Sequence, residues 1–98
     1  MATHDLEALL PWARKYMWWE APEESLRHPL RVVAQVMNIG DYDDVQALLA
    51  TVGESPFRHA IERAEPGQFN DRSWAYWHHR LGLAHGTRVP PAPQRHFS

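Results

Sequence analysis

Three aspartates stand close together near the middle of the chain, where their carboxylates could hold a cation. Asp41, Asp43 and Asp44 occupy one short segment, and carboxylate oxygens are the ligands that Mg²⁺ prefers in proteins. The same segment follows Gly40 and precedes an apolar helical pattern, so Asp41 is typical of an N-cap and the other two of an acidic first turn. We therefore expect these carboxylates to begin a helix, and we predict no metal and no cofactor.

The adjacent histidines His78 and His79 are the other residues that could bind a metal. Two ligands on one helix need a spacing of three or four residues to face the same ion. Neighbouring helical positions point in different directions, so the sequence predicts no metal site here.

Hydroxyl and carboxylate groups that could serve catalysis have simpler interpretations. Thr51, Ser55 and Ser73 each lie near a predicted helix end, where a hydroxyl is typical of a cap, and no G-x-S-x-G frame surrounds them. Glu62 and Glu65 have the i, i+3 spacing of any solvated helix face. We predict a protein that is not an enzyme and has no catalytic residues.

The elements that carry these residues are predicted to be helices throughout. Apolar residues recur with helical spacing along the whole chain, which predicts an all-α fold class. Prolines, glycines and cap residues divide the chain into a compact bundle of five or six short helices with short connections. The predicted helical segments are residues 6–17 with a break at Pro11, then 22–28, 29–39, 41–52, 55–64 and 70–81.

Two parts of this bundle are expected to bury unusually apolar surfaces. The helix after Pro29 is apolar over much of its circumference and should lie at the centre. Its buried stripe is predicted to be widened by Val32, Val36 and Ile39. Three tryptophans enlarge the apolar surface of the N-terminal arm, so we expect that arm to lie against the rest. These tryptophans are Trp12, Trp18 and Trp19.

Length and composition indicate one domain with a tail. The 98 residues are enough for one core, so residues 1–84 are predicted to form a single helical domain. Residues 85–98 contain three prolines and few core-forming side chains, which predicts an extended, flexible, Pro-rich C-terminal tail. The chain has no cysteine, which excludes disulfides and thiol catalysis.

Charge and hydropathy limit the partners. The formal net charge is -2, which gives no general attraction to phosphate backbones or anionic lipid. No apolar run approaches the roughly 20 residues that span a bilayer, and the N-terminus lacks a secretion signal. We expect a cytoplasmic protein with no membrane partner, and its oligomeric state stays open.

The two faces of the last predicted helix differ in character. A helical wheel places core-type side chains on one face, and these are Trp74, Trp77 and Leu81, with His78 at the edge. The opposite face carries Tyr and Arg, which are enriched at binding hot spots. We predict that this face contacts a partner, although a merely solvated polar face remains the alternative. The predicted partner-binding residues are Arg72, Tyr76, His79 and Arg80.

The hairpin around Gly40 allows a second functional hypothesis, a DNA-binding helix-turn-helix. The second helix of that hairpin begins with three carboxylates, which would face DNA phosphates at close range. The tail offers only Arg88 and Arg95 as basic residues. Nucleic-acid binding is therefore not expected. The alternatives kept are a DNA-binding transcriptional autoregulator and a helical domain of unknown role.

Residues 30–83 resemble small bacterial proteins that are encoded beside nucleotidyltransferase toxins of the abortive-infection AbiE type. The matching stretches are LRVVAQVMNIGDYDDVQALLATVG, a helix ending in RHAIERA, and PGQFNDRSWAYWHHRLGL. The resemblance implies an antitoxin-like protein that binds and neutralises a nucleotidyltransferase toxin. The N-terminal arm and the tail lie outside the resemblance.

Overall fold

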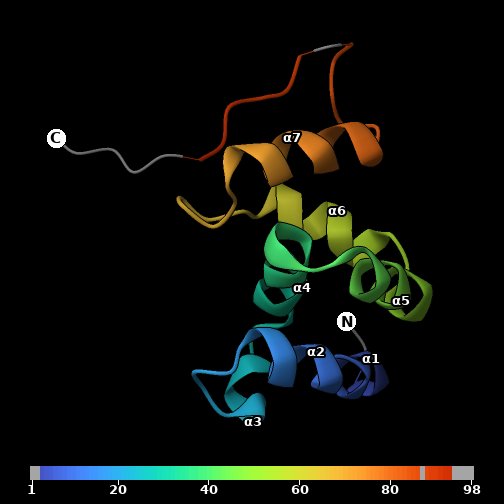
Figure 1. Cartoon of the computed structure of the whole chain (residues 1–98), viewed down its shortest axis with the longest axis vertical. Helices are drawn as coiled ribbons and strands as arrows, with labels where there is room; N and C mark the ends of the chain where they lie inside the picture. Colours follow the sequence, from blue (N-terminus) through green and yellow to red (C-terminus); the bar gives the residue numbers. More distant parts are fainter. Residues whose placement is uncertain (1–2, 87, 94–98) are drawn as a thin grey trace, which may run out of the picture.

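Seven α-helices make up the regular structure of the computed structural model, which describes residues 3–86 and 88–93 (Figure 1). They are α1 (Thr3–Ala8), α2 (Leu10–Tyr16), α3 (Pro22–Ser25), α4 (Pro29–Ile39), α5 (Tyr42–Val52), α6 (Ser55–Glu62) and α7 (Asp71–Arg80). No strand occurs in the described ranges, so the all-α prediction is confirmed. The predicted number of helices, five or six, was wrong. The N-terminal segment forms two separate helices, α1 and α2, and the single turn of α3 is a further helix.

Prolines set the starts of four helices. Pro11, Pro22, Pro29 and Pro56 each occupy one of the first two positions of α2, α3, α4 and α6. Proline is tolerated there because the first-turn N–H has no partner within the helix, and the ring fixes φ near the helical value. The break predicted at Pro11 is confirmed, since α1 ends at Ala8 and α2 begins at Leu10.

Two helices, α5 and α7, begin with a side-chain cap. Asp41 caps α5, because its Oδ1 accepts from the Asp44 backbone N–H at 2.8 Å. Asn70 caps α7 in the same way, accepting from the Ser73 N–H at 2.8 Å. The predicted acidic cap at Asp41 is confirmed, and Asn70, the first residue of the predicted segment 70–81, is the cap of α7.

The predicted hydroxyl caps were wrong. Ser55 lies inside α6, whose N-cap position is Glu54 with no side-chain cap bond. Thr51 Oγ1 donates to the carbonyl of Ala47, one turn back in α5. Ser73 Oγ donates to the carbonyl of Asn38 at the end of α4, so this hydroxyl joins two helices.

Glycine ends α4 and α7 for different reasons. Gly82 has φ of 71° and follows α7 in a Schellman motif, in which Leu83 N donates to His78 O at 2.7 Å. Gly40 has an ordinary φ of −67°, but a Cβ at this position would lie 2.4 Å from the Val36 carbonyl oxygen. Gly40 is therefore required by close approach of the backbone and not by a left-handed conformation.

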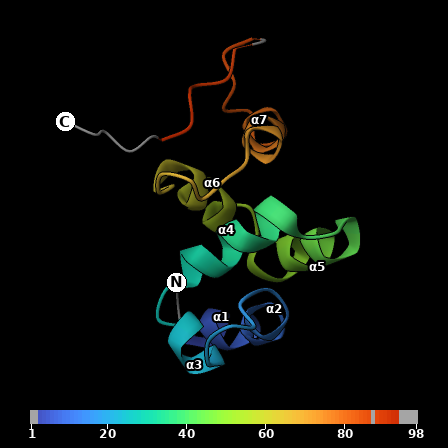
Figure 2. The same ribbon diagram turned by 60° about the vertical axis from the view of Figure 1, so that its left-hand side comes forward.

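Helix α4 lies at the centre of the molecule. The views of Figures 1 and 2 agree that α1, α2 and α3 lie on one side of it and α6 and α7 on the other, with α5 beside it. Five of its eleven residues are buried, which fits the central position predicted from its apolar circumference. α4 is therefore in contact with both halves of the chain.

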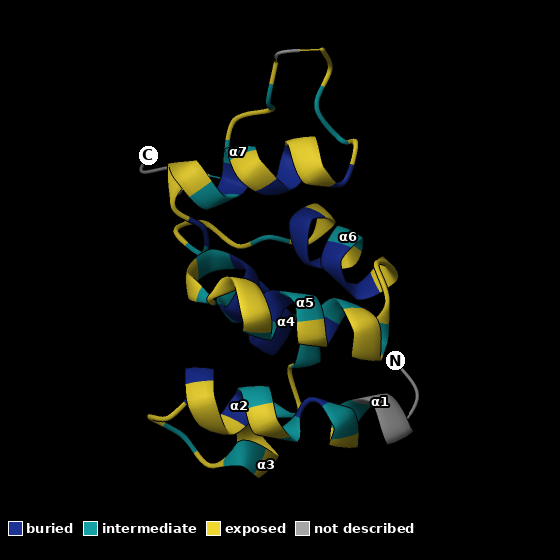
Figure 3. Cartoon of the chain, turned by 45° about the vertical axis from the view of Figure 1, so that its right-hand side comes forward, coloured by how far each residue is buried: buried dark blue, intermediate teal, exposed yellow. Residues whose placement is uncertain are grey.

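The main core lies where α4, α6 and α7 face one another (Figure 3), and buried residues of α5 and of the N-terminal segment, Leu9 and Tyr16, also belong to it. Trp77 and Phe57 are among the largest fully buried side chains, and their ring centroids are 5.1 Å apart. The predicted core face of α7 is confirmed, since its predicted core residues are all buried and His78 is buried with them. The buried members of this cluster on α7 and just after it are Trp74, Trp77 and Leu81.

The N-terminal arm, which consists of α1 to α3, contacts the body less extensively. A small separate cluster of Ala13, Met17 and Val32 joins α2 to α4. Trp12 packs against both clusters as predicted. Trp18 and Trp19 were wrongly expected to lie against the body, because α2 ends at Tyr16 and both follow in the exposed turn before α3.

Part of the predicted flexible tail, residues 85–98, is described, whereas residue 87 and residues 94–98, including Arg95, lie outside the described residues. Residues 88–93 form no helix. Trp74 Nε1 donates to the Pro90 carbonyl at 2.7 Å, and Val89 and Ala92 pack against the main core. This segment therefore lies over α7, and the flexibility of the tail stays a prediction.

Membrane crossing needs a long apolar helix. Among the helices of residues 3–86 and 88–93, none combines the length and the apolar character that a membrane span requires.

Candidate protein-binding groove

A hollow of about 580 Å³ opens between the end of α4, the start of α5 and the exposed face of α7. We call it the α4–α7 groove. Its wall combines apolar and aromatic side chains with one guanidinium group and the polar residues Asn38, Asn70 and Ser73. The apolar, aromatic and guanidinium side chains of the lining include Met37, Ile39, Tyr42, Arg72 and Tyr76.

Three of these side chains are large, apolar and exposed. The exposed fractions are 57% for Ile39, 74% for Tyr42 and 50% for Tyr76. Ile39 is the last residue of α4 and Tyr42 the first of α5, so the sharp connection at Gly40 brings both to the rim. Exposed apolar residues that gather around one hollow, instead of lying singly, are typical of interaction surfaces.

The frame of the groove is held by side-chain hydrogen bonds between α4 and α7. Trp77 Nε1 donates to the Met37 carbonyl at 2.8 Å, inside the core. Asn38 receives two more bonds, from the Ser73 hydroxyl to its carbonyl at 2.8 Å and from the Asn70 N–H to its Oδ1 at 2.9 Å. A wall fixed in this way loses little conformational entropy when a partner binds.

Only two of the four predicted partner-binding residues line the α4–α7 groove. All four are exposed, in agreement with the predicted helix face, but only Arg72 and Tyr76 line the groove. His79 and Arg80 lie on the last turn of α7 and are not part of the lining. No observation tests partner binding itself, so that role stays a prediction for all four.

Sequence reasoning missed Ile39 and Tyr42. Ile39 was wrongly assigned to the buried stripe of α4, because the wheel gives the direction of a side chain but not the length of helix that a neighbour covers. Tyr42 lies among the acidic residues of the α5 start, and no role was predicted for it. An aromatic residue at an exposed first turn was the available signal.

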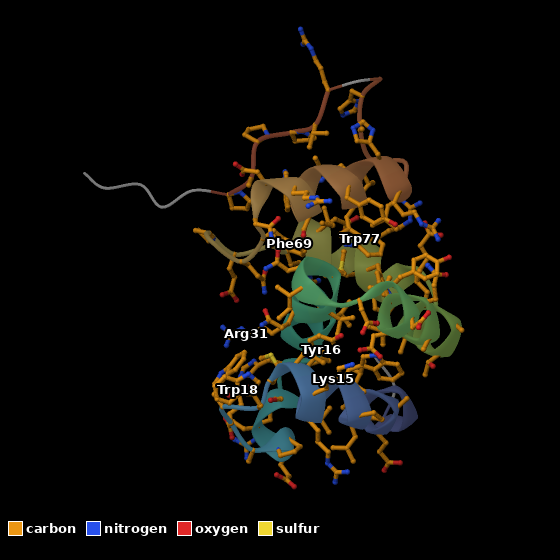
Figure 4. The ribbon with its side chains drawn as sticks, in the orientation of Figure 1. Lys15, Tyr16, Trp18, Arg31, Phe69 and Trp77 are labelled. Atoms are coloured by element: carbon orange, nitrogen blue, oxygen red, sulfur yellow. The ribbon has the colours of Figure 1, made fainter. Side chains whose placement is uncertain are left out.

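A polar cluster at Asp44 is the second place where functional side chains meet. Lys15 Nζ and Tyr16 OH each donate to Asp44 Oδ2 at 2.5 Å, and Trp12 Nε1 donates to the Asp44 carbonyl at 3.2 Å. Figure 4 shows Lys15 and Tyr16 on the side of α2 that faces α4 and α5. Three neighbouring side chains of α2 therefore connect the N-terminal arm to Asp44, which lies 28 to 32 positions further along the chain at the start of α5.

The hydrogen bonds of this cluster favour the charged forms of Asp44 and Lys15. The hydrogen bonds from Lys15 and Tyr16 lower the pKa of Asp44, and the bond to Asp44 raises the pKa of Lys15. Burial, followed by the bond to Asp44, raises the pKa of Tyr16. Each of these donors and acceptors is used within the protein, so the cluster has a structural explanation that needs no ligand.

The remaining candidates for metal binding are dispersed. His78 is buried and its Nδ1 lies 2.8 Å from the Trp74 carbonyl, which can only accept, so the proton is placed on Nδ1. His79 is exposed on the other side of α7. Within the described ranges, no three His, Asp or Glu side chains are grouped so that they could hold a metal ion.

Comparison with known proteins adds no further restriction. The chain matches no family model, no curated protein and no solved structure at a significant level.

Proposed function

We propose that this protein is a non-enzymatic binding module and that another protein occupies the α4–α7 groove. The observation that carries the proposal is the gathering of Ile39, Tyr42 and Tyr76, each at least half exposed, around one hollow. Such side chains give large contact area, and the two tyrosines add a hydroxyl at the rim. Arg72 supplies a charged group that can pair with a carboxylate of the partner.

The partner proposed is a nucleotidyltransferase toxin, and the role is that of an antitoxin. This part of the proposal is based on the resemblance of residues 30–83 to the AbiE-associated proteins. Every residue that lines the α4–α7 groove lies inside that segment, whereas the exposed Trp18 and Trp19 lie outside it. The groove is thus the exposed apolar surface that the resembling proteins would share.

The test is co-purification with the nucleotidyltransferase encoded beside this protein, followed by calorimetric titration of the two. Tyr76→Ala should weaken binding by about 1 to 2 kcal/mol, as expected for a partly exposed hot spot, with little change in the unfolding curve. Trp18→Ala is the matched control, because Trp18 is also an exposed aromatic residue but lies away from the groove.

Three results would overturn the proposal. One is the absence of any complex with the toxin, and another is equal weakening by both variants. The third is a melting curve that collapses in Tyr76→Ala while affinity per folded molecule stays unchanged, since Tyr76 would then be a core residue. Binding of the upstream operator with a steep salt dependence, in place of toxin binding, would favour the DNA-binding alternative.

A further inference from the structure

A second hollow, of about 530 Å³, lies at the opposite end of α4 from the α4–α7 groove. We call it the basic hollow. The start of α4, the end of α6 and the turn after α6 form its wall, and four basic side chains contribute to it. These side chains are His28, Arg31, His59 and Arg63. Arg31 projects at the edge of the molecule in Figure 4.

Two arginines, Arg31 and Arg63, bring positive charge to this hollow, although the formal net charge of the chain is -2. Glu65 is the single acidic residue in the wall, and it accepts from Arg31 Nε at 3.2 Å and from the terminal guanidinium nitrogen at 3.1 Å. Among the side chains of residues 6–86 and 88–93, no carboxylate lies within 4.0 Å of the side-chain nitrogens of Arg63, His28 or His59.

Packing of α4 against α6 is what brings these groups together. His28 and Arg31 flank the first turn of α4, while His59 and Arg63 lie one turn apart at the end of α6, where Arg63 N donates to His59 O at 2.9 Å. Arg31 and Arg63 carry like charge, and like charges held in one hollow repel one another. An anion in the hollow would remove that repulsion and receive charge-assisted hydrogen bonds.

We propose that the basic hollow binds a small phosphate ester. Guanidinium groups match the geometry of phosphate oxygens, and the N-terminus of α4 adds a field of the same sign. The hollow is larger than a bare phosphate needs and falls in the range of ligand pockets, roughly 300 to 1,000 Å³. Pro29, Leu30 and Ala60 form an apolar part of the wall that can contact the organic portion of the ester.

This inference does not depend on the proposed protein partner, because the two hollows share no lining residue. The test is an NMR titration of the full chain with adenosine monophosphate, inorganic phosphate and adenosine at constant ionic strength. Adenosine monophosphate should shift resonances around the hollow in a saturable way, and inorganic phosphate should do so more weakly. Adenosine, which has no phosphate, should leave these resonances unchanged.

Two variants sharpen the test. Arg63→Gln should weaken the affinity for adenosine monophosphate by about tenfold or more, because it removes charge-assisted hydrogen bonds. Arg58→Gln is the matched control on α6, since Arg58 is paired with Glu54 at 2.6 Å and lies outside the hollow. Its affinity should change by less than about twofold.

The proposal is overturned if adenosine monophosphate gives no saturable shift. It is also overturned if the two variants weaken binding equally, or if an acidic peptide binds the hollow while adenosine monophosphate does not. Circular dichroism of each variant ensures that an unfolded protein is not counted as a loss of binding. If Arg63→Gln unfolds, Arg31→Gln replaces it with the same expected loss.

Discussion

The two sides of α4 are held by different kinds of interaction. On one side, α6 and α7 pack through an aromatic core in which Phe57 and Trp77 contact each other. On the other side, the N-terminal arm adds two buried residues, Leu9 and Tyr16, to the main core, and it is also attached by a small apolar cluster that includes Met17 and by the polar cluster at Asp44. Most buried residues of the main core therefore belong to α4 to α7 and their connections, whereas the arm combines fewer buried residues with a few directional contacts.

This difference predicts which part of the molecule unfolds locally first. Hydrophobic stabilisation is proportional to the apolar area removed from water, which is large around Trp77 and small around Met17. Local opening follows the regions with few buried contacts. The arm should therefore exchange its amide hydrogens before α4, α6 and α7 do, while the α4–α7 groove remains formed.

The largest expected effect is on the body. Trp77→Ala removes a fully buried indole together with its hydrogen bond to the Met37 carbonyl. It should lower the free energy of unfolding by about 3 to 5 kcal/mol, which is a large fraction of the total stability of a typical domain. Urea denaturation followed by circular dichroism measures this loss. A loss of less than about 1 kcal/mol would show that the main core does not depend on this side chain.

A smaller effect is expected at the apolar cluster of the arm. Met17→Ala should destabilise the arm by about 2 kcal/mol, the low end for a buried methionine, because the cluster is small and lies at an edge. Hydrogen exchange should lose protection in α1 to α3, while α6 and α7 keep theirs. Equal loss of protection in all helices would mean that the two sides of α4 unfold as one unit.

The hydroxyl of Tyr16 should contribute less again. Tyr16→Phe removes the bond to Asp44 and leaves the ring in place, so the expected loss is about 1 kcal/mol. Tyr42→Phe is the control, because Tyr42 is exposed and its ring lies at the groove rim. If both variants have the same stability as the native chain, the polar cluster does not hold the arm.

The smallest effect is a dependence on pH at the arm junction. The pKa of Asp44 is lowered from 3.8, so the folded state favours its charged form, and this contribution is complete above pH 3.8 and lost as pH falls through the lowered value. The pKa values of Lys15 and Tyr16 are raised from 10.5 and 10.0, so their contribution is complete below those values and lost as pH rises through the raised ones.

The protection of the arm's amide hydrogens against exchange, corrected for intrinsic exchange rates, should therefore fall at acid pH and at alkaline pH. Between these limits the protection should stay constant. Asp44→Asn should flatten the acid limb, because its amide carries no charge to lose. An acid limb that persists unchanged in Asp44→Asn would assign the effect to other carboxylates.

Much of the secondary structure could be predicted because its causes are local. The caps at Asp41 and Asn70, the proline starts and the stop at Gly82 each depend on residues within a few positions. The core face of α7 followed from spacing alone. The candidate groove could be predicted only in part. Arg72 and Tyr76 lie on one helix, α7, whereas Ile39 and Tyr42 lie at the junction of α4 and α5, which only the tertiary structure brings beside α7.

The sequence by itself determined the helical class, most helix boundaries and the face of α7 that is buried, because each depends on short-range periodicity and capping. The tertiary structure decided that Ile39 stays uncovered, that Asp44 meets Tyr16, and that basic residues of α4 and α6 share a hollow. Tyr16 and Asp44 are 28 positions apart, and no local pattern specifies such a pairing. Contacts of that range are set by how whole helices pack, which involves the summed burial of many side chains.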